Sequence, residues 1–247
     1  VSSGTYAFVE EGATAGVKGF VVDTANPITM DTTPFTWTVF SSSLFGTTSL
    51  DNTALGQGAI GSITTAVNTT AIGNNSLSAL IGGLRNNALG YDSGKGITSG
   101  NDNISIGYKS MELVTGSSSS MVVVGNYALQ NNTTGTQSVA IGYQAMKANT
   151  SGSNNIALGY NALLVNLGGG NNIAIGALSL DSNLSGTQNI AIGTDALGLC
   201  SSGSQNVAIG YQAITTLISG NNNVAIGYLS LTTTSSSEST AVGSLSL

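Results

Sequence analysis

Apolar and polar residues alternate with period two in short segments that recur from residue 52 to the end of the chain. Each segment ends in an aliphatic residue followed by a glycine, and the twelve repeat glycines are Gly56, Gly73, Gly90, Gly107, Gly125, Gly142, Gly159, Gly176, Gly193, Gly210, Gly227 and Gly243. Nine of the eleven intervals are 17 residues, one is 18 and one is 16. The two irregular intervals contain Ser117–Ser120 and Thr232–Ser237, which are polar loop sequences. The pattern predicts one short strand and a glycine bend in every unit.

Positions counted from the repeat glycine are equally regular. Position −1 is aliphatic in all twelve units, and position −2 is Ala in ten, with Ser105 and Val123 as exceptions. Position −3 is β-branched except at Asn87, and position −4 is Asn in eight units. Position +3 is always Ala or Ser, and position +4 is apolar except at Gly94. The asparagines predict either a hydrogen-bonded ladder through successive units or a cap at the entry to a turn.

These positions lead to expectations about which side chains face inward. Residues −3 and −1 share one strand face, and we expect this aliphatic pair, together with one Leu per coil, to fill the core. The alanine row then lies on the other face, where small side chains allow another chain to approach closely. A second short strand is expected to begin at positions +3 and +4, as at Ala162 and Leu163.

A unit of 17 residues is too short for a repeated pair of helices but suits one coil of a solenoid. The expected fold is all-β, a parallel β-solenoid (β-roll) of about twelve 17-residue coils. Coils stacked at about 4.8 Å would give a rod of about 55–60 Å.

Aromatic residues divide the chain into two parts. All five Phe, the single Trp and both Pro lie in the first 45 residues. We therefore expect a small β-rich N-terminal domain at residues 1–45 and the solenoid at residues 46–247. A 45-residue unit buries little apolar surface by itself, so it is expected to need partner chains.

Charge and composition reduce the number of function classes that fit the chain. Charged residues make up 6% of the chain, the net charge is −6, and there is no His and one Cys. These values argue against nucleic-acid binding, a His-based catalytic site and a Cys or His metal site. No apolar run approaches the roughly 20 residues of a membrane-spanning helix. We expect no enzyme activity, no catalytic residues, no cofactor and no metal site.

Three local features of the sequence could take part in binding or chemistry. Gly100–Asn103 contains a single carboxylate, Asp102, which favours a turn over a calcium loop. Cys200 is expected in a loop, with no reactive role. Tyr follows the repeat glycine in six units and indicates either a stripe for carbohydrate or packing at a corner or subunit interface: Tyr91, Tyr108, Tyr143, Tyr160, Tyr211 and Tyr228.

The units at residues 155–163 (Asn-Ile-Ala-Leu-Gly-Tyr-Asn-Ala-Leu) and 206–214 (Asn-Val-Ala-Ile-Gly-Tyr-Gln-Ala-Ile) resemble the head repeats of YadA-like trimeric adhesins. The resemblance covers residues 52–247 and implies a homotrimer of left-handed parallel β-rolls. The units are longer than those of the adhesin heads, and in this they resemble repeats in fibre proteins of phages and large algal viruses. Residues 20–24 and 27–40 look like a segment of viral tail fibres.

The leading hypothesis is a non-enzymatic trimeric viral fibre or spike segment, a structural projection for host attachment on the virion surface or otherwise extracellular. Its expected partners are two further copies, other virion proteins through the N-terminal part, and a host-surface glycan or protein. We expect no nucleic acid and no membrane insertion. The alternatives are a bacterial trimeric autotransporter adhesin head and an ice- or surface-binding solenoid. The sequence names no receptor-binding residue.

Overall fold

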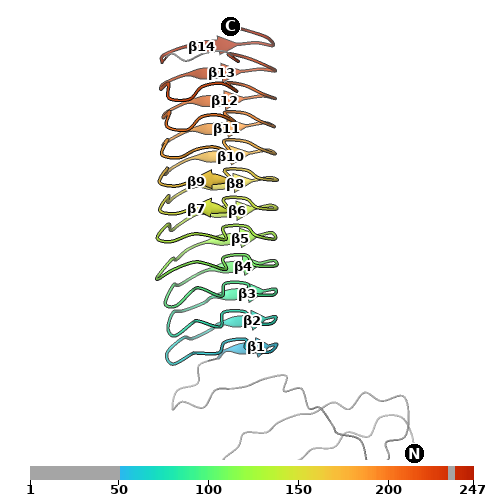
Figure 1. Cartoon of the computed structure of the whole chain (residues 1–247), viewed down its shortest axis with the longest axis vertical. Helices are drawn as coiled ribbons and strands as arrows, with labels where there is room; N and C mark the ends of the chain where they lie inside the picture. Colours follow the sequence, from blue (N-terminus) through green and yellow to red (C-terminus); the bar gives the residue numbers. More distant parts are fainter. Residues whose placement is uncertain (1–50, 233–236) are drawn as a thin grey trace, which may run out of the picture.

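The protein is an all-β parallel solenoid of about eleven turns (Figure 1). A computed structural model describes residues 51–232 and 237–247, so the expected N-terminal domain at residues 1–45 lies outside the described residues. Within these ranges the secondary structure consists of strands, turns and bends. The described residues accordingly contain no helix with the length and apolarity needed to cross a membrane.

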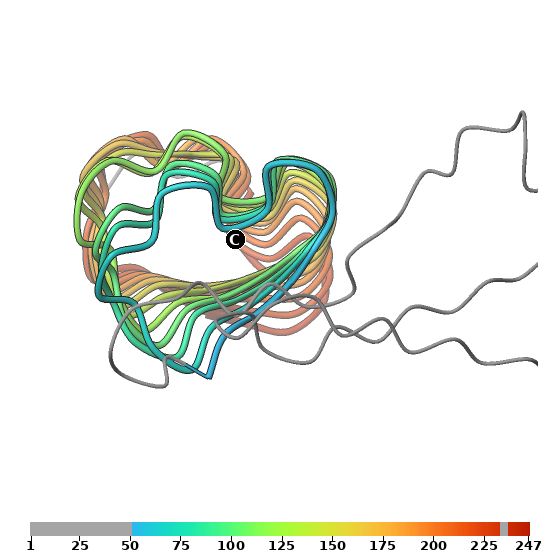
Figure 2. The same ribbon diagram turned by 90° about the horizontal axis from the view of Figure 1, so that it is seen from below.

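One strand from each coil joins a single sheet that runs the length of the stack. Its members are β1 (Thr53–Leu55), β2 (Thr70–Ile72), β3 (Asn87–Leu89), β4 (Ile104–Ile106), β5 (Val122–Val124), β6 (Val139–Ile141), β8 (Ile156–Leu158), β10 (Ile173–Ile175), β11 (Ile190–Ile192), β12 (Val207–Ile209), β13 (Val224–Ile226) and β14 (Thr240–Val242). All neighbours pair in parallel, and equivalent positions lie opposite each other, as Ala157 does with Ala174. Each position of the unit therefore forms a column along the stack, as the superposed coils of Figure 2 show.

The expected second strand at positions +3 and +4 is wrong for every described coil. That wall is built from turns, with Asn161 and Leu163 both in the left-handed backbone region (φ 53° and 50°). The wall still bonds to the next coil, since the Leu163 amide donates to the Ser179 carbonyl over 2.9 Å. A second strand pair occurs once in the described part, between β7 (Ala148–Asn149) and β9 (Val165–Asn166). Alternating left-handed residues bend the chain in and out, which excludes an extended strand.

The expected orientation of the strands is also wrong, because the alanine row points inward. Ala157 and Ala174 are completely buried within one chain, while Leu158 is 43% exposed. The coil is narrow, and the opposite wall fills it with its own large residues at position +4, such as Leu163 and Leu180. At Gly94, the one +4 position without a side chain, an added Cβ would lie 3.6 Å from the Cβ of Ala88. The strand thus contributes small residues to a core whose volume is filled from the other side.

The asparagines at position −4 form the predicted ladder. The backbone N–H of Asn172 donates to Asn155 Oδ1 over 2.9 Å, and the backbone N–H of Asn189 donates to Asn172 Oδ1 over 3.0 Å. Each side chain also donates inside its own coil, as Asn172 Nδ2 does to the Gly186 carbonyl over 2.9 Å. One side chain therefore fastens neighbouring coils and closes the loop of its own coil, which satisfies buried polar groups that would otherwise cost free energy.

A second buried ladder occupies position +7 in four successive coils. This position is not among those that the repeat pattern identifies as regular. Asn149 Nδ2 donates to Asn132 Oδ1, and the series continues through Asn166 and Asn183 at 2.6–2.8 Å. The coils below carry Ile, Leu or Val in this column, and the coil above carries Cys200. Because a thiol replaces the amide there, Asn183 Oδ1 is buried with no hydrogen-bond partner.

Cys200, which was expected in a loop, does lie outside the strands, and this column buries it. Cys200 is completely buried, its Sγ lies 3.6 Å from the Gly203 carbonyl oxygen, and burial raises its pKa to about 11. A buried thiol with a raised pKa carries little thiolate near neutral pH and is a poor nucleophile.

We predict that Asn166→Leu lowers the free energy of unfolding by about 2–4 kcal/mol, because it leaves Asn149 Oδ1 without its donor and removes one acceptor from Asn183. The matched variant Asn183→Leu also removes a donor, but the oxygen that it deletes, Asn183 Oδ1, already lacks a hydrogen-bond partner. It is therefore expected to cost about 1 kcal/mol less than Asn166→Leu. Denaturant unfolding of both variants checks the order, and an equal loss in both would show that the ladder contributes no net stability.

Candidate interaction surfaces

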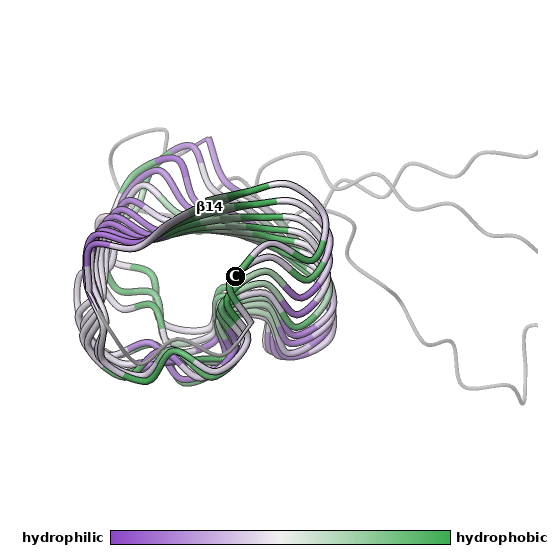
Figure 3. Ribbon diagram, turned by 90° about the horizontal axis from the view of Figure 1, so that it is seen from above, coloured by the Kyte–Doolittle hydropathy of each residue, from purple (hydrophilic) through white to green (hydrophobic). Residues whose placement is uncertain are grey.

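The outward side chains of the large sheet make a continuous apolar surface along the solenoid. We define the outer aliphatic face as positions −3 and −1 of the twelve strands, for example Ile156 and Leu158 in β8. Position −1 is aliphatic in every strand, and Leu89 is 47% exposed. Figure 3 shows the stacked strands coloured as hydrophobic, next to a hydrophilic loop. Exposed apolar areas of this extent mark association surfaces in soluble proteins.

The outer aliphatic face carries no charged residue at either position in any of the twelve strands. Its polar members are Thr53, Thr70, Asn87 and Thr240, which lie in strands toward the two ends of the described stack. The central strands, β4 to β13, present two aliphatic side chains each. A partner for such a face needs an apolar surface with the same repeat along the stack.

The twelve repeat glycines lie directly after these strands and set how closely the coils stack. All have φ between 128° and 144°, a region that side-chain-bearing residues rarely adopt. From Gly56 to Gly227, an added Cβ would also collide with the backbone of the glycine in the next coil. At Gly142, for example, it would lie 2.7 Å from the carbonyl carbon of Gly159. The column of glycines is thus a place where successive backbones meet without room for a side chain.

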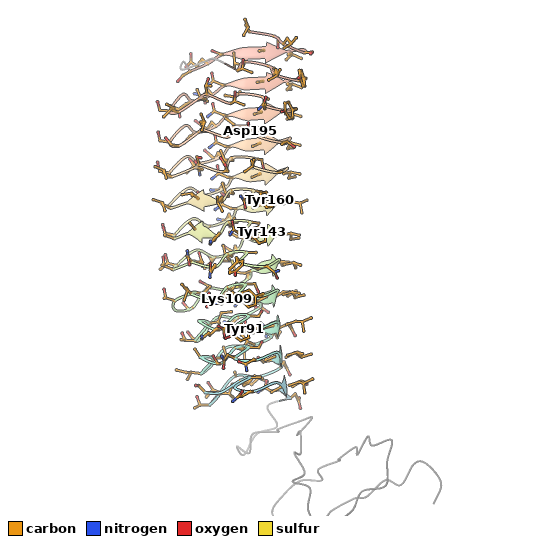
Figure 4. The ribbon with its side chains drawn as sticks, turned by 45° about the vertical axis from the view of Figure 1, so that its right-hand side comes forward. Tyr91, Lys109, Tyr143, Tyr160 and Asp195 are labelled. Carbon is orange, nitrogen blue, oxygen red and sulfur yellow. The ribbon has the colours of Figure 1, made fainter. Side chains whose placement is uncertain are left out.

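The tyrosines of position +1 form stacked pairs on the outside of the coils. Tyr91 and Tyr108 stack with centroids 5.4 Å apart, and Tyr143 and Tyr160 stack at 5.5 Å. Tyr127, from position +2, joins these pairs edge-on, so five rings form one column. The labelled tyrosines lie one above another along the solenoid in Figure 4. The sequence pattern at position +1 alone did not include Tyr127.

The stacking limits what the tyrosine column offers to a ligand. Rings that stack within a pair cover one face of each other, so a sugar ring cannot lie flat on those faces. Faces without a ring neighbour occur where the column is interrupted. The stripe was predicted to contact carbohydrate or to pack at an interface. Either contact would have to use the ring edges or the ring faces at those interruptions.

Charged side chains pair with one another in the lower coils. Asp102, the carboxylate of the rejected calcium loop, lies 2.5 Å from the Arg85 guanidinium, which lowers the pKa of Asp102. Lys109 lies 2.8 Å from Glu112. Within the described ranges no group of three or more His, Cys, Asp or Glu residues comes together in a way that could hold a metal ion. The features that the described residues present to solvent are thus the outer aliphatic face, the tyrosine column and these ion pairs.

The fold and these surfaces place the chain in the class of parallel β-solenoid proteins with an exposed apolar sheet face. The chain matches no family model, no curated protein and no solved structure. The surfaces of the chain and the resemblance of its repeat units are therefore what indicates a function.

Proposed function

We propose that the chain is a non-enzymatic segment of a homotrimeric viral fibre or spike, which holds an attachment surface away from the particle. The observation that carries the proposal is the outer aliphatic face, which runs along the whole described stack and is uncharged. Burying it against other chains would contribute about 25 cal/mol for each Å² of apolar surface removed from water. An elongated subunit with such a face suits a role as a structural projection.

Copies of the same chain are the partners that fit this face best. Its side chains repeat at the spacing of the coils, and another copy has the same spacing along its whole length. Packing of equivalent faces around a common axis gives closed cyclic symmetry, the usual arrangement of homo-oligomers. The number three comes from the resemblance of the repeat units to the heads of YadA-like adhesins. In this proposal the aliphatic face forms the seam, because the alanine row is buried inside each coil.

The N-terminal residues and the exposed loops would have separate roles in such a fibre. The N-terminal residues would join the fibre to other virion proteins, and exposed loops would contact a host-surface glycan or protein. Several weak contacts on a trimer would bind together more tightly than one alone. A bacterial trimeric adhesin head would use the same seam and is the second candidate.

An ice- or surface-binding solenoid is less well supported. Such a role needs a flat, regular array of polar side chains facing water, whereas the regular outward face here is aliphatic. Threonines in the loops are occupied by bonds between coils, as Thr115 Oγ1 donates to the Thr133 carbonyl over 3.2 Å.

The native mass of the 1–247 chain in solution tests the proposal. We expect a mass near three times 24.6 kDa by light scattering. The double variant Ile175→Asp with Ile192→Asp puts charges into the centre of the seam and should lower the mass toward that of one chain. Leu184→Asp, at an exposed loop position outside the outer aliphatic face, should leave it unchanged. A monomeric parent chain would overturn the trimeric fibre.

A further inference from the structure

The tyrosine column is interrupted for two coils. Position +1 is Tyr160 in one coil, Ala177 and Thr194 in the next two, and then Tyr211. Three coil steps of about 4.8 Å put the two tyrosines about 14 Å apart. We call these four residues the tyrosine break.

The two rings that border the tyrosine break have no ring stacked on the side that faces it. Tyr160 stacks on Tyr143 below, and Tyr211 stacks on Tyr228 above, at 5.5 Å in both pairs. In the described part of the chain neither ring has a second aromatic neighbour. Tyr160 is 55% exposed and Tyr211 is 46% exposed. The break thus presents two accessible aromatic faces with short side chains between them.

Two carboxylates lie beside the tyrosine break without a cationic partner. Asp195 directly follows Thr194, and its Oδ2 accepts a hydrogen bond from Gln212 Nε2 over 3.0 Å. Asp181, from the coil below, is half-buried, and burial together with the nearby charge of Asp195 raises its pKa. Residues 148–247 contain no Lys or Arg. Asp195 is seen with Tyr160 and Tyr143 along the same side of the solenoid in Figure 4.

In the lower coils, the chain itself provides an ammonium group at the equivalent positions. At position +2, where the upper coil has Asp195, an earlier coil has Lys109. Its Nζ lies 2.8 Å from Glu112, the residue at the position of Asp181, and 5.7 Å from the centre of the Tyr108 ring. Lys147 Nζ lies 5.6 Å from the centre of the Tyr127 ring. An ammonium group of the chain therefore lies near both an acid and a tyrosine in one lower coil, and near a tyrosine in another.

We propose that the tyrosine break binds a glycan that carries free amino groups, with its ammonium groups at Asp195 and Asp181 and its sugar rings against Tyr160 and Tyr211. Aromatic faces attract both cations and the apolar faces of sugars. An anionic glycan would meet two carboxylates and no cation. The proposal names a ligand class for the attachment role given above, but the binding itself requires neither that role nor a trimer.

Calorimetry or NMR titration of the intact 1–247 protein with a β-1,4-linked glucosamine tetramer tests the proposal. The fully N-acetylated tetramer, which lacks the charges, and spermidine, which lacks the rings, should each bind about fivefold more weakly or less. Asp195→Asn and Tyr160→Ala should each weaken binding of the glucosamine tetramer about threefold or more.

Two control variants separate this site from general effects. Glu238→Gln removes a negative charge from a distant loop, and Tyr91→Ala removes the ring at the other end of the five-ring column. Neither should change binding. No binding of the glucosamine tetramer, equal binding of its N-acetylated form or of spermidine, or equal weakening by Tyr91→Ala would overturn the proposal. Native mass measured on the same samples tests the trimer separately, so a monomer that binds would contradict only the fibre.

Discussion

Gly142→Ala is expected to lower the free energy of unfolding by more than about 4 kcal/mol, or to prevent the central coils from stacking. Two effects add at this position. The backbone has φ at 135°, where an alanine is strained, and its Cβ would collide with the backbone of Gly159 in the next coil. Neither backbone can move away, because the Gly142 amide donates to the Val124 carbonyl and the Gly159 amide to the Ile141 carbonyl, over 2.8 Å and 2.9 Å. Denaturant unfolding followed by circular dichroism measures the loss.

Gly243→Ala is the matched control for this experiment. Its φ of 130° is nearly the same, but an added Cβ would meet no atom nearer than Ser246 Cβ at 4.0 Å. It should therefore cost only the backbone strain, about 1–2 kcal/mol. If both variants lose the same stability, the collision between coils is not what requires glycine at these positions.

Ala174→Asp is expected to unfold the coils around β10, with a loss of several kcal/mol. The alanine side chain is completely buried among the large residues of the opposite wall, so the new carboxylate would lie in the core without a partner. Ala177→Asp, three residues later in the same coil, places the same group on the partly exposed outer surface and should change stability by less than about 1 kcal/mol. Thermal unfolding of the two variants reports the difference.

This pair also tests which side of the strand faces inward. If the aliphatic pair faced the core, Ala174→Asp would be tolerated and substitution of Ile175 by Asp would unfold the coil. A stable Ala174→Asp variant would therefore contradict the orientation of the sheet.

Much of the solenoid follows from the repeat alone. The glycine spacing predicts the coil length, and the period-two pattern predicts the strand before each glycine, including β8 and β12. The regular asparagines predict a ladder, which Asn155 and Asn172 confirm. These features are local or repeat at fixed spacing, so that identical positions in successive coils stack on one another.

The parts that the sequence left open depend on contacts across the coil. The tyrosines after the glycine are visible in the pattern, but Tyr127 joins their column from a different position. The second asparagine ladder begins at Asn132 and ends at Asn183, within a column that is aliphatic in the coils below and continues with Cys200 above. The residue type at this position differs between coils, so a search for regular positions does not reveal the ladder.

The repeat pattern is enough to establish that this chain stacks short coils through parallel strands, each followed by a glycine. It does not establish which face of the strand is buried. Alternation places Ala157 on one face and Ile156 and Leu158 on the other, and it is equally consistent with either face turned inward. The choice depends on the opposite wall, where large residues such as Leu163 fill the narrow coil and leave room mainly for small side chains at position −2. The larger aliphatic residues are consequently outside, where they form the surface on which the proposed function rests.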